Sequence, residues 1–387
     1  MKRTHNYPVL LALVFGLLWG CGSSGGGDNQ TSNANGSGSS TSTTSTTTTT
    51  TFIKEFSIPP DQNGRVSAPY GLTVDNQKQI WFAAEIDNPF APDQIGVFDS
   101  INETFPSPRI IPGAPNSTSP QPPVTDTQPR GLAFDPATGD FWFTESGTSV
   151  IGQVHGLFNI FEYPVPTQDS RPLGITIDPT TGWVWFTENA SGKIGQLKPL
   201  DANSGTTDGF TEYPRGIHPT GIAVDSQQNI WFTDPGANQL GELDVSSGVG
   251  IIKYFPIPTP ASNPNGIAID SQDRVWFTET DKNKIGRFDP TATPGPQFEE
   301  YPLPNNGSSP SGIAIDPGTG VVWFTEFRGN RIGRLDPTLA TPGTSDGITE
   351  LQIPTPNSGP TSIVIDADKV VWFSETTAKK IGKLTPP

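Results

Sequence analysis

Residues 264–287 read PNGIAIDSQDRVWFTETDKNKIGR, and this stretch recurs along the chain in recognisable form. The runs GIAID and VWFTE are rich in branched and aromatic side chains, which favour β-strands, and the polar residues between them are typical of a turn. A third short run, KIGR, follows the polar residues TDKN. The stretch therefore predicts three consecutive strands joined by tight turns, and we name these strands a, b and c.

The pattern occurs seven times. Its tryptophan recurs with a period of about 46 residues, which is the length of a four-stranded propeller blade. The tryptophans are Trp81, Trp142, Trp185, Trp231, Trp276, Trp323 and Trp372. Apolar or aromatic runs such as residues 298–302 and 348–353 supply a fourth strand, d. The sequence predicts an all-β, seven-bladed β-propeller with four-stranded blades over residues 52–387.

The two ends of the repeat array predict how the ring closes. Residues 51–58 (TFIKEFSI) resemble a strand d with no strands a, b or c before it, and residues 380–384 (KIGKL) are a strand c with no strand d after it. We expect the N-terminal strand to complete the last blade, which hides edges that would otherwise be open to pairing.

Two repeated residue types have structural interpretations. The tryptophans are expected in the core, and an aspartate that ends each strand a is expected to fix the a–b turn by accepting backbone N–H groups. These aspartates are Asp75, Asp135, Asp178, Asp225, Asp270, Asp316 and Asp366.

The first 51 residues are expected to serve export and anchoring rather than the fold. Residues 1–20 carry Lys2 and Arg3 before an apolar run too short to span a bilayer, which is typical of a signal peptide. Cys21 follows Gly20, as in a lipobox, and is the predicted lipidation site; an ordinary signal peptide with a stray cysteine is the alternative. The Gly-, Ser- and Thr-rich residues 21–51 would be a disordered linker. We expect a membrane-anchored lipoprotein of the cell envelope, at the outer membrane or cell surface.

Composition excludes several function classes. The formal charge is −16, which disfavours nucleic acid as a partner, and one cysteine makes no intrachain disulfide. There are three histidines, too few for transition-metal sites of the usual kind, and neither a nucleophile elbow nor a phosphate-binding loop is present. We expect a monomer that binds a small molecule or a protein.

Chemistry is expected at the mouth of the propeller. The residue between Pro and Gly at the start of each strand a, here called the slot residue, should point to the mouth, as should the acid that ends strand b. The binding candidates are the slot residues Tyr70, Arg130, Asn265, Ser311 and Thr361. A ring of acids, Glu85, Glu145, Glu188, Asp234, Glu279, Glu326 and Glu375, would attract a cation such as Mg²⁺ or Ca²⁺, with Glu326 and Glu375 as candidate ligands. Alternatively, each acid caps its own b–c loop.

The motifs P-x-G-I-x-x-D, W-F-T-E and N-K-I-G-R, as in residues 264–287, resemble the virginiamycin B (streptogramin B) lyase family over roughly residues 52–387. The resemblance implies metal-assisted elimination at an ester, with Mg²⁺ held by two glutamates and with histidines at the mouth for proton transfer. The histidine positions hold Ser311 and Thr361, and one glutamate position holds Gly359. Glu375 is a near match to the other glutamate, and Tyr70 matches an active-site position.

Three functions follow as hypotheses. The first is a binding propeller without catalysis, because the proton-transfer residues are absent. The second is a lyase that uses Tyr70, His218 and Glu375 in a rearranged site. The third is a metal-dependent lactonase with Asn265 among its ligands. The long connection at residues 106–129 would either cover the mouth or be a tolerated insertion.

Overall fold

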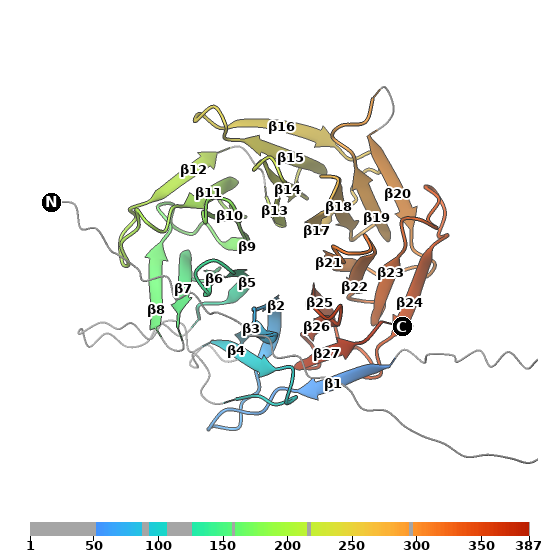
Figure 1. Cartoon of the computed structure of the whole chain (residues 1–387), viewed down its shortest axis with the longest axis horizontal. Coiled ribbons are helices and arrows are strands. Elements are labelled where there is room, and N and C mark those ends of the chain that lie inside the picture. Colours follow the sequence, from blue (N-terminus) through green and yellow to red (C-terminus); the bar gives the residue numbers. More distant parts are fainter. Residues whose placement is uncertain are drawn as a thin grey trace, which may run out of the picture. The chain divides into compact units, whose positions relative to one another are not determined.

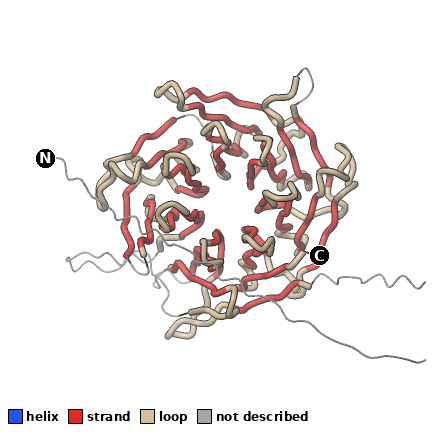
Figure 2. Tube along the Cα trace, in the orientation of Figure 1, coloured by secondary structure: helices blue, strands red, loops and turns tan. Residues whose placement is uncertain are grey.

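The structure, a computed structural model, describes residues 52–86, 93–106, 126–156, 159–214, 218–293 and 297–386. Strands and loops make up this part of the chain (Figure 2), and none of it forms a helix able to cross a membrane. The predicted signal peptide, Cys21, the linker and most of the 106–129 connection lie outside the described residues.

Seven antiparallel sheets are arranged around a central axis, so the predicted seven-bladed β-propeller is confirmed (Figure 1). The blades are numbered in chain order. Their strands are β2 (Ala68–Val74), β3 (Gln79–Glu85) and β4 (Gln94–Asp99) in blade 1; β5 (Pro129–Asp135), β6 (Asp140–Glu145), β7 (Val150–His155) and β8 (Asn159–Pro164) in blade 2; β9 (Pro172–Ile177), β10 (Val184–Glu188), β11 (Lys193–Leu197) and β12 (Phe210–Pro214) in blade 3; β13 (Ile222–Val224), β14 (Ile230–Asp234), β15 (Gln239–Asp244) and β16 (Ile251–Pro256) in blade 4; β17 (Pro264–Ile269), β18 (Val275–Glu279), β19 (Lys284–Phe288) and β20 (Phe298–Pro302) in blade 5; β21 (Pro310–Ile315), β22 (Val322–Glu326), β23 (Arg331–Leu335) and β24 (Ile348–Gln352) in blade 6; and β25 (Pro360–Ile365), β26 (Val371–Glu375), β27 (Lys380–Leu384) and β1 (Ile53–Ser57) in blade 7.

Six blades have four strands, as predicted, and blade 1 has three among the described residues. Where its fourth strand would lie, Thr104 forms a single bridge with Asp99. The chain then enters the 106–129 connection, of which residues 107–125 are not described. The four-stranded prediction is therefore confirmed for blades 2 to 7.

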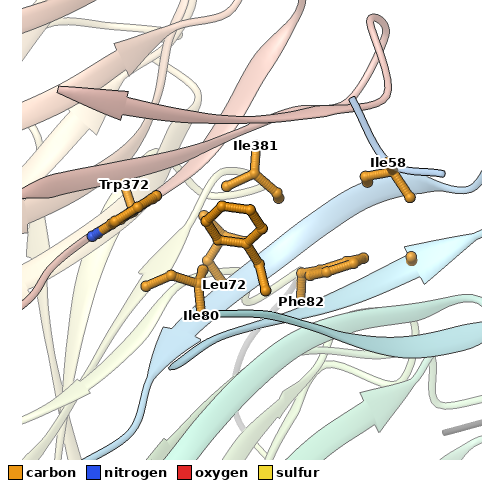
Figure 3. Close-up of a cluster of buried hydrophobic side chains, with 8 residues drawn as sticks. Ile58, Leu72, Ile80, Phe82, Trp372 and Ile381 are labelled. Atoms are coloured by element: carbon orange, nitrogen blue, oxygen red, sulfur yellow. The ribbon is translucent and has the colours of Figure 1, made fainter. Parts of the chain in front are cut away.

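The predicted closure of the ring is present. Strand β1 pairs with β27 antiparallel, with Ile53 opposite Leu384 and Ser57 opposite Lys380. Immediately after β1, Ile58 packs into a cluster with Trp372 and Ile381 of blade 7 and with side chains of blade 1 (Figure 3). The N-terminal strand therefore completes blade 7 and also supports its contact with blade 1.

The repeated residues have the structural roles expected of them. The seven tryptophans are between 0% and 8% exposed. Each strand-a aspartate accepts backbone N–H groups of the following turn; Asp270 Oδ1, for example, accepts from Gln272 at 2.9 Å and Arg274 at 3.0 Å. The same bond is made in every blade and fixes the a–b turn.

Candidate functional site at the propeller mouth

The innermost strands line a central cavity of about 200 Å³. Its wall comes from the same two positions in all seven blades, a glycine (Ser362 in blade 7) followed by Leu or Ile. This lining offers backbone and aliphatic groups, and none of its side chains is charged. Binding chemistry must therefore come from the slot residues next to it.

A repeated hydroxyl holds the slot residues in a ring. In blade 5, Thr278 Oγ1 accepts the Gly266 N–H at 2.9 Å and donates to the backbone carbonyl of Ser311, the slot residue of blade 6, at 3.0 Å. Blades 2, 3, 4, 6 and 7 repeat this link. The predicted slot residues are thus brought together around one cavity.

Blade 1 differs, because Ala83 occupies the position of this threonine and has no hydroxyl to donate to the Arg130 carbonyl. The side chains of Tyr70, Arg130 and Glu85 gather at this junction instead. Arg130 Nη1 lies 2.7 Å from Glu85 Oε2, and its guanidinium carbon lies 4.0 Å from the centre of the Tyr70 ring. The Arg130 and Glu85 side chains remain about one quarter exposed, at 24% and 25%. The mouth therefore presents a charged and aromatic group on one side.

Tyr70 is suited to binding rather than to proton abstraction. Burial raises the pKa of its phenol above the usual value, the charge of Arg130 opposes this rise, and the charge of Glu85 adds to it. The phenol is therefore protonated at neutral pH and acts as a hydrogen-bond donor. Its ring and the Arg130 guanidinium suit a planar or anionic group of a ligand.

The other slot residues present short polar groups. Asn265 Nδ2 donates to Ser311 Oγ at 3.3 Å. The Thr361 hydroxyl lies 2.8 Å from Ser374 Oγ and 2.6 Å from Thr376 Oγ1, so its hydrogen bonds are used within blade 7. Within the described part of the chain, the hydroxyls of Ser311 and Thr361 contact only amide and hydroxyl groups, none of which would make them bases.

The three residues of the rearranged lyase hypothesis are not brought together. His218 is exposed on the rim, where its Nδ1 lies 3.1 Å from the Asn189 carbonyl oxygen. Tyr70 contacts Arg130 at the blade 1–2 junction, and Glu375 is fully buried in blade 7. Tyr70 belongs to blade 1, His218 precedes the first strand of blade 4, and Glu375 belongs to blade 7.

The expectation that the strand-b acids face the mouth is wrong. Glu145, Glu188, Asp234, Glu279, Glu326 and Glu375 are all between 0% and 1% exposed. Glu279, for example, lies opposite Pro264 in the sheet and has no exposed surface, so its carboxylate is not available at the mouth. The alternative of loop capping holds in part: Thr148 and Ser191 hydroxyls donate to Glu145 and Glu188.

The assignment of Glu85 to this set is also wrong. Pro69 pairs with Ala84 in blade 1, as Pro264 pairs with Glu279 in blade 5. Ala84 therefore takes the acid's position, and Glu85 is one residue further along, where it reaches Arg130. The signal was in the sequence: W-F-A-A-E is one residue longer than W-F-T-E.

Each buried glutamate on strand b lies near a glutamate on strand d of its blade. Burial, reinforced by Glu55, raises the pKa of Glu375 to about 8. The pKa of Glu55 lies below its usual value. Burial alone would raise it, but hydrogen bonds from Thr355 and the charge of Lys380 together outweigh burial. Burial gives pKa values of about 8 for Glu145 and Glu279 and about 7 for Glu188 and Glu326. At neutral pH, Glu375 is therefore a protonated interior group.

The residues do not fit the Mg²⁺ site that the resemblance implies. At Gly359, φ is +63°, and a Cβ there would lie 2.3 Å from Thr377 Oγ1, so a glutamate is not accommodated. The candidates Glu326 and Glu375 are fully buried. In the described part of the chain, no three His, Cys, Asp or Glu side chains are grouped so as to hold a metal ion.

Comparisons with known proteins define the family. The family model described as the virginiamycin B lyase family matches residues 114–343. A comparison with curated protein sequences returns no match. A streptogramin B lyase structure has 29% identity and a TM-score of 0.69, covering 87% of this chain and 97% of its own. Virginiamycin B lyase from Staphylococcus aureus has 30% identity and a TM-score of 0.69, covering 87% and 100%.

A further structure of the S. aureus enzyme is a catalytically inactive histidine-to-alanine variant with quinupristin. It has 29% identity and a TM-score of 0.69, and covers 87% of this chain and 100% of its own. The family match spans more than half of the chain, and the structural matches span the propeller. The chain belongs to the virginiamycin B lyase family.

Proposed function

We propose that this protein is an envelope lipoprotein whose propeller binds a ligand at its mouth without cleaving it. The observation that carries the proposal is the Tyr70–Arg130–Glu85 cluster, which offers an aromatic face and a partly exposed guanidinium. The hydroxyls of Ser311 and Thr361 supply no base, and Gly359 leaves no room for a metal-binding glutamate. Among the described residues, the mouth has groups for recognition, and the positions of the family's histidines hold no base.

Quinupristin is a suitable probe, because a family member has been crystallised with it. We expect the wild-type protein to bind it in calorimetry while its mass stays unchanged. Tyr70→Ala and Arg130→Gln should each weaken binding at least about tenfold, since each removes part of the cluster.

The matched control is Arg274→Gln. It breaks another arginine–carboxylate pair, to Asp270 at 2.6 Å, in the a–b turn of blade 5. Binding unaffected by Tyr70→Ala and Arg130→Gln, or an absence of binding to the wild-type protein, would refute this placement.

Family membership makes the lyase the second candidate. Incubation with quinupristin and Mg²⁺ distinguishes the two, because a lyase yields a linearised product. If that product forms and disappears in Glu375→Ala, the binding proposal fails. Hydrolysis of a simple lactone in the presence of Ca²⁺ would support the lactonase instead.

The anchor is a separate part of the proposal and rests on the sequence of residues 1–21 alone. We expect the protein to incorporate labelled palmitate and to fractionate with membranes in a bacterial host. Cys21→Ser should abolish the label and release the protein. Membrane association that persists in Cys21→Ser would contradict lipid anchoring.

A further inference from the structure

A second, larger cavity of about 710 Å³ lies between blades 6 and 7, away from the mouth. Trp323 and Leu351 line its apolar part. Its polar part is lined by Thr349 and by two ion pairs, Arg334–Asp336 and Lys369–Asp316. This volume is within the range of small-molecule sites. The residues at the same positions in blade 5 explain why the space exists.

In blade 5 the residues at these positions contact one another. The Tyr301 ring stacks on Trp276 with centroids 5.8 Å apart, and its hydroxyl donates to Glu299 Oε2 at 2.6 Å. Arg287 lies over the Trp276 ring at 5.3 Å and pairs with Glu299. A phenol ring and a carboxylate from strand β20 thus cover the tryptophan and pair with the arginine.

Blade 6 keeps the tryptophan and the arginine of this group but not the tyrosine and the glutamate. The strand registers align Arg334 with Arg287 and Trp323 with Trp276. On the fourth strand, however, Leu351 stands where blade 5 has Tyr301, and Thr349 stands where it has Glu299. Blades 2, 3, 4 and 7 place Tyr163, Tyr213, Phe255 and Phe56 near their tryptophans. Trp323 therefore lacks the aromatic neighbour found in those blades, and Arg334 lacks a carboxylate on the neighbouring strand.

Among the described residues, the connectivity of the sheet also leaves this cavity uncovered. Between blades 5 and 6, the loop that joins β23 to β24 covers the corresponding space. Ala340 of this loop packs against the apolar cluster that contains Trp276 and Tyr301, and Gly343 N–H donates to the Glu300 carbonyl at 2.8 Å. In blade 7, the strands in these positions are β27 and β1, which are not consecutive in the chain. No such loop joins them, and Pro386 is the part of the described chain that borders the cavity here.

We propose that this cavity binds a small aromatic carboxylic acid. The aromatic ring replaces the missing tyrosine ring beside Trp323 and Leu351, and the carboxylate replaces the missing glutamate opposite Arg334. Arg334 now donates to Asp336 at 3.1 Å and is 31% exposed, so it can turn to an incoming carboxylate. Lys369, 57% exposed and 3.8 Å from Asp316, supplies a second positive charge at the rim.

The probe is 4-hydroxyphenylacetate, with 4-methylphenol as its uncharged counterpart, titrated into the full chain and followed by NMR or tryptophan fluorescence. We expect the acid to bind, and Arg334→Gln to weaken it at least about tenfold while leaving 4-methylphenol unaffected. Arg287→Gln in the filled blade 5 is the matched control and should change neither affinity. If 4-hydroxyphenylacetate bound to Arg334→Gln as tightly as to the wild-type protein, the proposed contact between the carboxylate and Arg334 would be wrong.

The double variant Thr349→Glu/Leu351→Tyr rebuilds the blade 5 set within blade 6. It should block both probes and raise the midpoint of thermal unfolding, which shows that the variant is folded. No binding to the wild-type protein, or undiminished binding to this folded variant, would overturn the proposal. Tyr70→Ala should leave this binding unchanged, so the cavity and the mouth are tested independently.

Discussion

Glycine in the I-G pair of strand c is required by a contact inside each blade. A Cβ built at Gly286 would lie 2.1 Å from Cζ of Phe277 on the neighbouring strand, and each of the other six blades repeats this approach. Such a distance is well inside van der Waals contact, so the strand-c glycine gives the strand-b phenylalanine its space. The repeated I-G and W-F motifs are therefore two halves of one packing unit.

Gly286→Ala should lower the free energy of unfolding by about 1–3 kcal/mol, because the added methyl overpacks the blade. Urea denaturation measures the change. Phe277→Leu removes the ring, so Gly286→Ala should be less destabilising in that background than in the wild type. Additive effects of the two substitutions would show that the ring is not the obstacle.

At the scale of single residues, sequence reasoning placed the slot residues and missed the direction of the acids. Threonine-to-carbonyl and serine-to-carbonyl hydrogen bonds link the Pro-x-Gly positions into a ring, while the role of the slot side chains in binding stays a prediction. Glu326 and Glu375 were misplaced because a repeat pattern does not show whether the surrounding chain encloses the side chain at a strand end. The Arg130–Glu85 pair joins two blades, and a repeat pattern read one blade at a time carries no such information.

The blade is the element in which the buried carboxyl pairs act. A carboxyl group whose pKa is raised on folding keeps its proton to higher pH in the folded state than in the unfolded state. Glu145, Glu279 and Glu375 have pKa values of about 8 against an ordinary value of 4.5. Between pH 4.5 and about pH 8, the folded protein therefore binds more protons than the unfolded protein. The free energy of unfolding falls as the pH rises through this range.

We therefore expect stability to be highest in weakly acidic solution and to decrease from about pH 5 to about pH 8. Below that range, Glu212 and Glu300 act in the opposite direction: their pKa values are lowered, and the stability that they provide is lost as the pH falls through them. Denaturant unfolding across this pH range checks the sign. Stability that rises steadily from pH 5 to pH 8 would contradict it.

Glu375→Gln isolates one such pair. The amide keeps the size of the side chain and has N–H groups that can donate, but it carries no ionisable proton. The variant should be more stable than wild type at pH 8 by at least about 1 kcal/mol, and its stability should fall less with rising pH. At pH 4.5 the two proteins should differ little. A variant less stable than wild type at pH 8 would show that Glu375 is ionised in the fold.

At the scale of the whole molecule, the sequence predicted the number of blades, the four strands of blades 2 to 7 and the closing strand, because each follows from a repeat of known length. It did not predict the cavity between blades 6 and 7. That cavity depends on two departures from the repeat, at Thr349 and Leu351, which gain meaning only when the strand registers are known. The repeated features of the blades can thus be predicted from the sequence, whereas the cavity arises where one blade departs from the repeat.

Ring closure gives the last prediction. Strand β1 forms the outer strand of blade 7, and Ile58 packs with Trp372, Ile381 and the blade 1 side chains (Figure 3). Phe56 packs against the same cluster. A chain beginning at Phe52 should unfold in one cooperative transition, whereas a chain beginning at Pro59 exposes the edge of β27 and leaves Trp372 partly uncovered. We expect the shorter chain to lose at least about 3–5 kcal/mol and to aggregate.

The substitution Ile58→Ala, in the full chain, tests the same contact without deleting the strand. It should lower the free energy of unfolding by about 2–5 kcal/mol, because Ile58 is 2% exposed. Phe52→Ala is the control, since Phe52 is 73% exposed and should change little. If the chain beginning at Pro59 were as stable as the chain beginning at Phe52, strand β1 would not be closing the ring, since an open blade 7 cannot match a sealed one in buried apolar surface.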